Sequence, residues 1–171
     1  MNLVLIGYRG TGKSTVGRML ASRLKRRLIS TDAEIVRRAG ESIPDIVKRV
    51  GWDGFRDLES KVLHELSEQD NLIIDTGGGA ILRPENAEAL RRGGRLFWLT
   101  ATVDTIRRRI RADTQRPSLT GTKSFLEEIT EVLAEREPKY RAAAHEIVPT
   151  DDRTAPDIAQ AILERFQAAG Y

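Results

Sequence analysis

The sequence has 171 residues, of which 40% are apolar and 31% are charged. These values are typical of a single globular domain that buries a core of its own. The sequence contains no cysteine, which excludes disulfide bonds and thiolate metal sites. Its apolar runs are far shorter than the roughly 20 residues that span a bilayer, and its first residues lack the pattern of a signal peptide. We therefore expect a cytoplasmic protein with no membrane partner.

Lysine and arginine outnumber aspartate and glutamate by 28 to 25, which gives a formal net charge of +3. Nucleic-acid binding is one explanation of a basic balance. The arginines, however, alternate with acidic residues along predicted helices, and no nucleic-acid-binding motif is present. Because the planar guanidinium group matches phosphate and carboxylate oxygens, the arginines also suit an anionic small molecule. We therefore predict a small-molecule partner, no nucleic acid and a monomeric chain.

The first half of the chain alternates between strand-like and helix-like segments. A short aliphatic run before glycines predicts a buried strand at Asn2–Ile6, and apolar residues on one helical face predict a helix at Lys13–Leu24. A second strand is predicted at Leu28–Ser30. The capping-box spacing of residues 31–34 predicts that a helix starts there, and Ser42 marks another helix start.

The second half continues this alternation. A longer helix is predicted from apolar positions 58, 62 and 66, and a third strand at Leu72–Asp75. The remaining predicted elements are a helix from Pro84, a strand at Arg95–Leu99, helices around Val103–Ile110 and Phe125–Leu133, a strand at Glu146–Val148 and a last helix capped by Thr154.

Five strands separated by helices predict an α/β domain with a parallel sheet, right-handed crossovers and helices on both faces. One segment, Ala112–Lys123, departs from the pattern because it is polar, contains Pro117 and Gly121 and has no helical face. A loop of this length in a compact domain is often a lid over a binding site. We therefore predict a lid at residues 112–123.

The segment Gly7-Tyr-Arg-Gly-Thr-Gly-Lys-Ser14 fits the phosphate-loop pattern G-x-x-x-x-G-K-[ST], between a predicted strand and a predicted helix. Glycines let the backbone approach an anion, and successive N–H groups point at it from the positive end of the helix. Lys13 is expected to reach the β- and γ-phosphates, and Ser14 to offer its hydroxyl to Mg²⁺. The alternative is a glycine-rich turn with a surface lysine, but a chance match has a probability of only about one in a hundred. We therefore predict a nucleotide triphosphate site.

A kinase also needs a site for the acceptor, and ligands of open parallel sheets lie beyond the carboxyl ends of the strands. Asp32 follows the second predicted strand, and Thr76-Gly-Gly-Gly79 follows the third. Charged candidates elsewhere are Arg56, Arg116 in the predicted lid, and Arg141.

These residues lie in motifs through which the chain resembles the shikimate kinase family. The motifs, in family order and spacing, are Gly7–Ser14, Thr31-Asp32, Gly54-Phe-Arg56, Thr76-Gly-Gly-Gly-Ala80, Arg116-Pro117 with Leu119-Thr-Gly121, and Glu135-Arg-Glu-Pro-Lys-Tyr-Arg141. The resemblance implies a transferase that converts ATP and shikimate to ADP and 3-phosphoshikimate in aromatic amino-acid biosynthesis. It further implies a P-loop nucleoside-monophosphate-kinase-like fold with strand order 2-3-1-4-5, a core of residues 1–30, 61–111 and 124–171, a substrate-binding section at 31–60 and the lid at 112–123.

The resemblance also assigns residues to ATP and Mg²⁺. The metal is assigned to Ser14, and Lys13, Asp32 and Arg116 are the residues assigned to catalysis. Arg116 would neutralise charge on the γ-phosphate; the alternative is a solvated loop arginine. Arg109 would lie near the adenine, with a solvated helix face as the alternative, and Arg153 is a further candidate on the adenine side. The nucleotide-binding residues implied are Gly10, Thr11, Gly12, Lys13, Ser14, Thr15, Arg109, Arg116 and Arg153.

The acceptor residues implied by the resemblance are Asp32, Arg56, Gly77, Gly78, Gly79 and Arg141. Asp32 would bind the acceptor hydroxyls and draw off the proton, although it could instead cap a helix. Arg56 and Arg141 would hold the carboxylate of the acceptor, with surface ion pairs as the alternative. Gly78 would offer a backbone N–H where a side chain would obstruct the substrate.

One position departs from the family pattern. Most members carry Asp-Thr-Asp after the second strand, whereas this chain reads Ser30-Thr31-Asp32. The missing carboxylate normally lies near Mg²⁺, so we expect weaker retention of the metal. Two other functions stay open at this point: a related kinase for another small hydroxy acid, and a nucleotide-binding module without catalysis.

Overall fold

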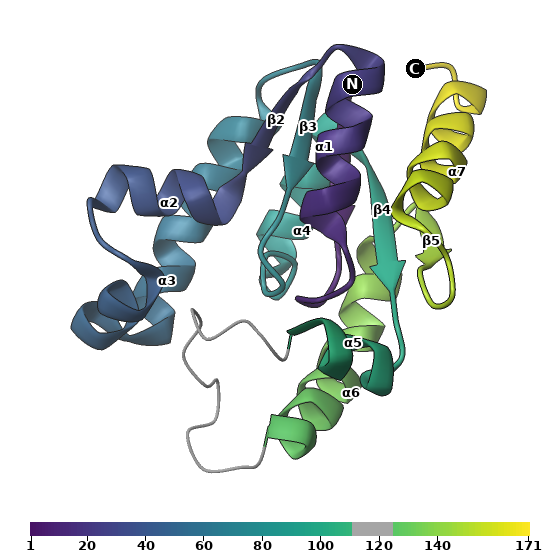
Figure 1. Ribbon diagram of the computed structural model, residues 1–171. Helices are drawn as coiled ribbons and strands as arrows, with labels where there is room; N and C mark the ends of the chain where they lie inside the picture. The colour runs from purple at the N-terminus through teal and green to yellow at the C-terminus, as the bar shows by residue number, and fades with distance from the viewer. Residues whose placement is uncertain (111–124) are drawn as a thin grey trace.

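The computed structural model describes residues 1–110 and 125–171. Within these residues, five parallel strands form one sheet in the order β2-β3-β1-β4-β5, with helices on both faces (Figure 1). The predicted fold class and strand order are therefore confirmed. The predicted lid, with Arg116, lies outside the described residues.

The strands lie where they were predicted, with ends that differ by at most one residue. They are β1 Asn2–Ile6, β2 Arg27–Ser30, β3 Leu72–Asp75, β4 Gly94–Thr100 and β5 Glu146–Pro149. The helices are α1 Lys13–Leu24, α2 Thr31–Ala39, α3 Ile43–Ser67, α4 Pro84–Gly93, α5 Val103–Ile110, α6 Phe125–Ala143 and α7 Ala155–Ala168.

Side-chain caps fix the starts of three helices. Ser42 and Thr154 accept bonds from the backbone three residues on, as their sequence context predicted. Helix α2 starts one residue earlier than a cap at Thr31 would place it, because Ser30 is the N-cap and accepts a bond from the N–H of Ala33 at 3.3 Å. The side chain of Thr31 is thereby free to turn inward, where its Oγ1 accepts a bond from Gly77 N–H at 3.0 Å.

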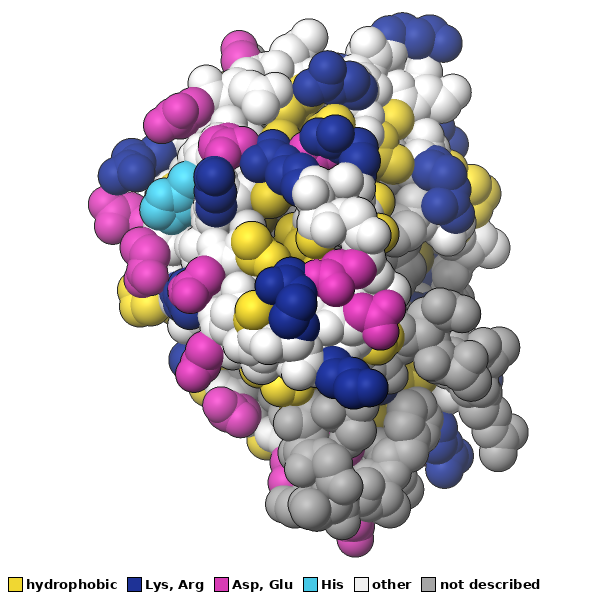
Figure 2. All heavy atoms as spheres, turned by 90° about the vertical axis from the view of Figure 1, so that its left-hand side faces the viewer, with side chains coloured by type: hydrophobic (Ala, Val, Ile, Leu, Met, Phe, Trp, Pro, Cys, Tyr) yellow, Lys and Arg dark blue, Asp and Glu magenta, His cyan; other side chains and the backbone are white. Residues whose placement is uncertain are grey.

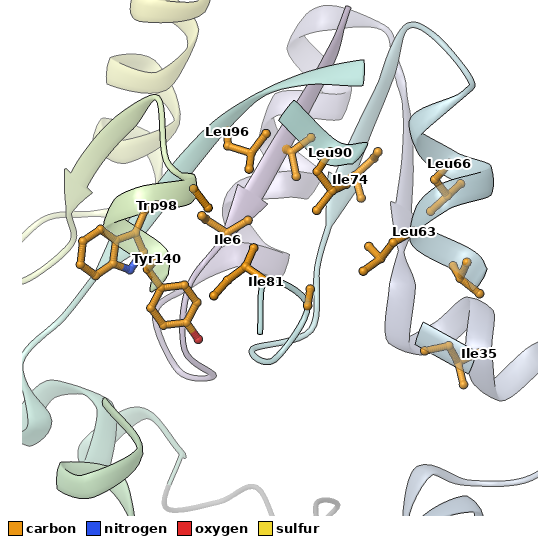
Figure 3. Close-up of a cluster of buried hydrophobic side chains, with 14 of the residues drawn as sticks. Ile6, Ile35, Leu63, Leu66, Ile74, Ile81, Leu90, Leu96, Trp98 and Tyr140 are labelled. Atoms are coloured by element: carbon orange, nitrogen blue, oxygen red, sulfur yellow. The ribbon is translucent and has the colours of Figure 1, made fainter. Parts of the chain in front are cut away.

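Two apolar cores sandwich the sheet, because successive residues of a strand point to opposite faces. Leu3 and Leu5 of β1 pack with α1 and α7 on one face. Val4 and Ile6 pack with side chains from α3, α4 and α6 on the other. On that second face the rings of Trp98 and Tyr140 lie side by side close to Ile6 and Ile81 (Figure 3), with centroids 5.6 Å apart. Both faces of the central strands β1 and β3 are thus buried.

The surface over α2 and α3 mixes basic and acidic side chains. Figure 2 shows lysine and arginine interleaved with aspartate and glutamate on this face, without one continuous basic patch. Several of these charges are paired; Arg37 and Arg38, for example, both bond Glu34. The helices of the described ranges are all too short or too polar to cross a membrane.

Candidate active site

The phosphate loop connects the end of β1 to the start of α1. Gly10 and Gly12 have φ angles of 80° and 92°, a left-handed region that a β-carbon disfavours. The loop and the ends of β2 and β3 border a cavity that we call the phosphate cavity. Its walls include Gly10, Gly12, Lys13, Ser14, Thr15, Asp32, Asp75, Gly78 and Arg109.

Two loop side chains are held in place by neighbouring groups. Lys13 is 7% exposed, and its ammonium donates to the backbone oxygens of Gly7 at 2.7 Å and Tyr8 at 3.0 Å. The hydroxyl of Ser14 donates to Oδ2 of Asp75 at 2.6 Å. The sequence analysis placed both loop residues here, but it gave no role to Asp75.

A second cavity, which we call the acceptor cavity, lies next to the phosphate cavity. Its charged walls are Arg9, Asp32, Arg56, Glu59 and Arg136, its aromatic walls are Tyr8, Trp52 and Phe55, and its floor includes Gly77, Gly78 and Gly79. Asp32, Gly78 and Arg9 border both cavities. Their shared position puts a carboxylate and a backbone turn at the junction of the two spaces.

The three glycines after β3 allow charged side chains to lie directly on the backbone. A β-carbon at Gly77 would be 2.8 Å from Oδ1 of Asp32 and 2.8 Å from Oε2 of Glu59. A β-carbon at Gly79 would overlap the guanidinium of Arg56, and one at Gly78 would be 3.3 Å from Nη1 of Arg136. The turn therefore brings together functional groups from α2, α3 and α6.

Arg56 and Glu59, three residues apart on α3, form an ion pair of 2.7 Å on the wall of the acceptor cavity. The guanidinium of Arg56 also lies over the rings of Trp52 and Phe55, with its carbon 5.4 and 5.3 Å from their centroids. Burial raises the pKa of the Glu59 carboxyl, while the charge of Arg56 acts in the opposite direction. Glu59 thus holds Arg56 at the cavity.

This wall includes buried polar atoms that lack a hydrogen-bond partner among the residues that the structure describes, such as the hydroxyl of Tyr8 and Oε2 of Glu59. Buried polar atoms in folded proteins are nearly always paired, with protein, water or a bound molecule. The acceptor cavity therefore suits a ligand that carries hydroxyl groups.

The position of Arg141 differs from the expectation. Its side chain is 60% exposed, pairs with Glu137 at 3.1 Å and lies over the ring of Trp98, away from the acceptor cavity. Arg136 borders that cavity instead and is 7% exposed. Five residues on an α-helix correspond to a rotation of about 140°, so the two arginines of α6 face different spaces.

The inward direction of Arg136 follows from a pattern that the sequence contains. Val132, Arg136 and Tyr140 are spaced by four residues and lie on one face of α6, and all three are buried. The hydroxyl of Tyr140 donates to the carbonyl of Gly78, and burial raises the pKa of Tyr140 to about 12. Extending the apolar stripe of this helix would have selected Arg136 over Arg141.

The residues expected near the nucleotide base border a groove on the other side of the loop. Arg109 of α5 donates to the hydroxyl and the carbonyl of Thr150, at 3.0 and 3.1 Å. Arg153 donates to the carbonyl of Pro149 at 3.1 Å. Both arginines line this groove together with loop residues Gly10, Thr11, Gly12 and Thr15.

Comparison with known proteins identifies the family. The family model described as shikimate kinase matches residues 9–167 of the chain. The chain belongs to the shikimate kinase family. A relative named shikimate kinase from Syntrophus aciditrophicus is 43% identical, over 99% of this chain and 93% of its own length. Another from Symbiobacterium thermophilum is 42% identical, over 99% of this chain and 98% of its own length.

A solved structure of the same family agrees. Shikimate kinase from Acinetobacter baumannii, solved in complex with shikimate, is 38% identical and superimposes with a TM-score of 0.93, covering 98% of this chain and 93% of that chain. The resemblance drawn from the motifs is therefore confirmed, and with it the assignment of the chain as an ATP-dependent kinase of the shikimate kinase family.

Proposed function

We propose that this chain transfers the γ-phosphoryl group of ATP to a hydroxyl of shikimate, giving ADP and 3-phosphoshikimate. The observation that carries the proposal is the position of Asp32 at the junction of the phosphate and acceptor cavities. In the transfer, the acceptor oxygen forms a bond to the γ-phosphorus as the bond to the bridging oxygen of ADP breaks. The Asp32 carboxylate accepts the hydroxyl hydrogen bond, orients that oxygen and takes up its proton.

Positively charged side chains of the acceptor cavity would hold the carboxylate of the acceptor. Arg56 and Arg136 both border the acceptor cavity, and guanidinium groups bind a carboxylate in a planar, bidentate manner. The unpartnered oxygens of Tyr8 and Glu59 supply further contacts for hydroxyl groups. A small polyol with one carboxylate, such as shikimate, matches this set.

The donor is held by the loop and its neighbours. Backbone N–H groups of the loop and the ammonium of Lys13 bind the phosphates, and Arg109 and Arg153 border the side where the base lies. Ser14 would hold Mg²⁺ through its hydroxyl, and the ion would supply positive charge beside the phosphates. The described residues contain no cluster of three or more His, Cys, Asp or Glu that could hold a metal ion. The contribution of Arg116 stays a prediction.

The proposal includes a monomeric chain that acts on small molecules in the cytoplasm, and among the described residues both cavities are lined by this one chain. The decisive experiment is a coupled assay of ADP release with Mg·ATP, with and without shikimate. We expect turnover only with shikimate. Turnover with another hydroxy acid, such as gluconate, but not with shikimate would refute the acceptor. Tight ATP binding without turnover on any acceptor would indicate a nucleotide-binding module.

A further inference from the structure

Asp75 lies where a metal bound to the nucleotide would be. It is the last residue of β3, its side chain is 6% exposed, and its Oδ2 accepts a hydrogen bond from Ser14 Oγ at 2.6 Å. Ser14 is the loop hydroxyl that serves Mg²⁺ in proteins of this loop type. A metal ion held by that hydroxyl would therefore lie close to the carboxylate of Asp75.

The register of the sheet places Asp75 beside the serine that departs from the family pattern. Ser30 of β2 pairs with Asp75 of β3, and Asp75 pairs on its other side with Leu5 of β1. Ser30, Asp75 and Ser14 all border the phosphate cavity. A carboxylate at position 30 and one at position 75 would therefore reach the same space from adjacent strands.

The cavity offers two carboxylates among its described walls, Asp32 and Asp75, and they face different neighbours. Asp32 also borders the acceptor cavity, where its Oδ1 lies against the backbone of Gly77. Asp75 does not border the acceptor cavity and contacts the loop instead. Mg²⁺ in nucleotide sites takes one or two carboxylates together with phosphate oxygens and water. In P-loop enzymes a strand-end aspartate acts with the loop serine in this way.

We infer that Asp75 is the carboxylate that retains the nucleotide-bound Mg²⁺ in this chain, so that β3 supplies the charge that position 30 of β2 lacks. The inference rests on the proposed binding of Mg·ATP at the loop. It replaces the expectation that Ser30 leaves the metal weakly held. With the carboxylate on β3, Ser30 serves as the N-cap of α2 at no loss to the metal.

The test measures binding of ATP with and without Mg²⁺, in the absence of any acceptor. The metal-dependent gain is the ratio of the ATP dissociation constant in EDTA to that in Mg²⁺, obtained by calorimetry. For Asp75→Asn we expect this gain to fall by about ten- to a hundredfold, with metal-free ATP binding retained. Asp104→Asn is the matched control, because Asp104 lies on α5 with a side chain that is 80% exposed. An unchanged gain in Asp75→Asn would overturn the inference.

A second variant moves the carboxylate back to β2. The double variant Ser30→Asp/Asp75→Ala should regain most of the metal-dependent gain that Asp75→Ala loses. Failure of this recovery in a folded double variant would overturn the claim that positions 30 and 75 serve the same ion.

Circular dichroism and melting temperature establish whether each variant is folded. If Asp75→Asn does not fold, the pair Asp75→Ala and Ser30→Asp/Asp75→Ala gives the same comparison, with Mn²⁺ bound to ADP and followed by electron paramagnetic resonance. Because no acceptor is present, failure of the shikimate assignment would leave these results unchanged.

Discussion

Arg136 and Arg141 both lie on α6, but only Arg136 borders the acceptor cavity. Arg136 is buried beside Gly78 in the acceptor cavity, whereas Arg141 is exposed and paired with Glu137. This arrangement makes them a matched pair for testing which positive charge holds the acceptor.

The first prediction follows from this pair. Replacing Arg136 by lysine removes the bidentate contact with a carboxylate, which is worth about 1.5 to 3 kcal/mol for a charged hydrogen bond. We expect kcat/KM for shikimate to fall by about ten- to a hundredfold, with the KM for ATP unchanged. Arg141→Lys should leave both constants near those of the unmodified enzyme. Steady-state kinetics on the two variants decides the matter, and equal losses in both would contradict the assignment.

The second prediction concerns the backbone turn under Arg56. Gly79→Ala places a methyl group where the guanidinium of Arg56 now lies, so that the arginine must move. The KM for shikimate should rise by about tenfold, because a displaced arginine loses its charged hydrogen bonds. ATP affinity serves as the internal control. The same alanine introduced together with Arg56→Ala should have little additional effect, and a full additional loss would show that the turn acts by another route.

The third prediction tests Asp32 as the catalytic carboxylate. Asp32→Asn keeps the shape of the side chain but removes its ability to take a proton, so kcat should fall by about 10²- to 10⁴-fold. The dissociation constant for ATP should change little. Asp57→Asn is the control, since Asp57 is an exposed residue of α3 that pairs with Arg83. Unchanged turnover in Asp32→Asn would reduce Asp32 to a structural residue of the first turn of α2.

The fourth prediction uses the buried phenol of Tyr140. Its pKa is raised to about 12 in the folded protein by burial, so the neutral form is favoured by folding. A raised pKa contributes stability that is lost as the pH rises from the unfolded value near 10 toward the folded value near 12. At neutral pH, Tyr140→Phe should lower the free energy of unfolding by about 1 to 3 kcal/mol, because the carbonyl of Gly78 loses its donor.

The sign of the pH effect distinguishes this account from a simple loss of packing. Between pH 8 and pH 11 the unmodified protein should lose on the order of 1 kcal/mol that Tyr140→Phe does not lose, so the two curves converge. Urea unfolding at both pH values gives the comparison. A stability difference that stays constant with pH would contradict the raised pKa.

Strands and the phosphate loop could be predicted because their signals are local. The aliphatic run of β1 is buried on both faces in any parallel sheet, and the loop requires its glycines whatever surrounds it. The acceptor site depends on which face of α6 is buried. The motif from Glu135 to Arg141 contains two arginines, and only the continued spacing of Val132, Arg136 and Tyr140 separates them.

The role of Asp75 could not be predicted from a local sequence pattern, for a different reason. Its importance depends on the pairing of β2 with β3, residues more than forty positions apart in the chain. Strand register is set by long-range packing rather than by neighbouring residues. Glu59 is an intermediate case, because its spacing of three from Arg56 on a helix was visible, whereas its complete burial was not.

The residues at the end of β3 connect the phosphate cavity to the acceptor cavity. Asp75 borders the phosphate cavity, Gly77 borders the acceptor cavity, and Thr76 between them is tied to the carbonyl of Leu5 by both its N–H and its hydroxyl. Asp75 and Gly77 are only two residues apart, so the short segment that follows β3 borders both cavities. The side chains that select the acceptor lie on other elements, namely α2, α3 and α6. A change of acceptor through those three helices would keep the transfer distance intact, which makes this scaffold open to new substrates without a redesign of its chemistry.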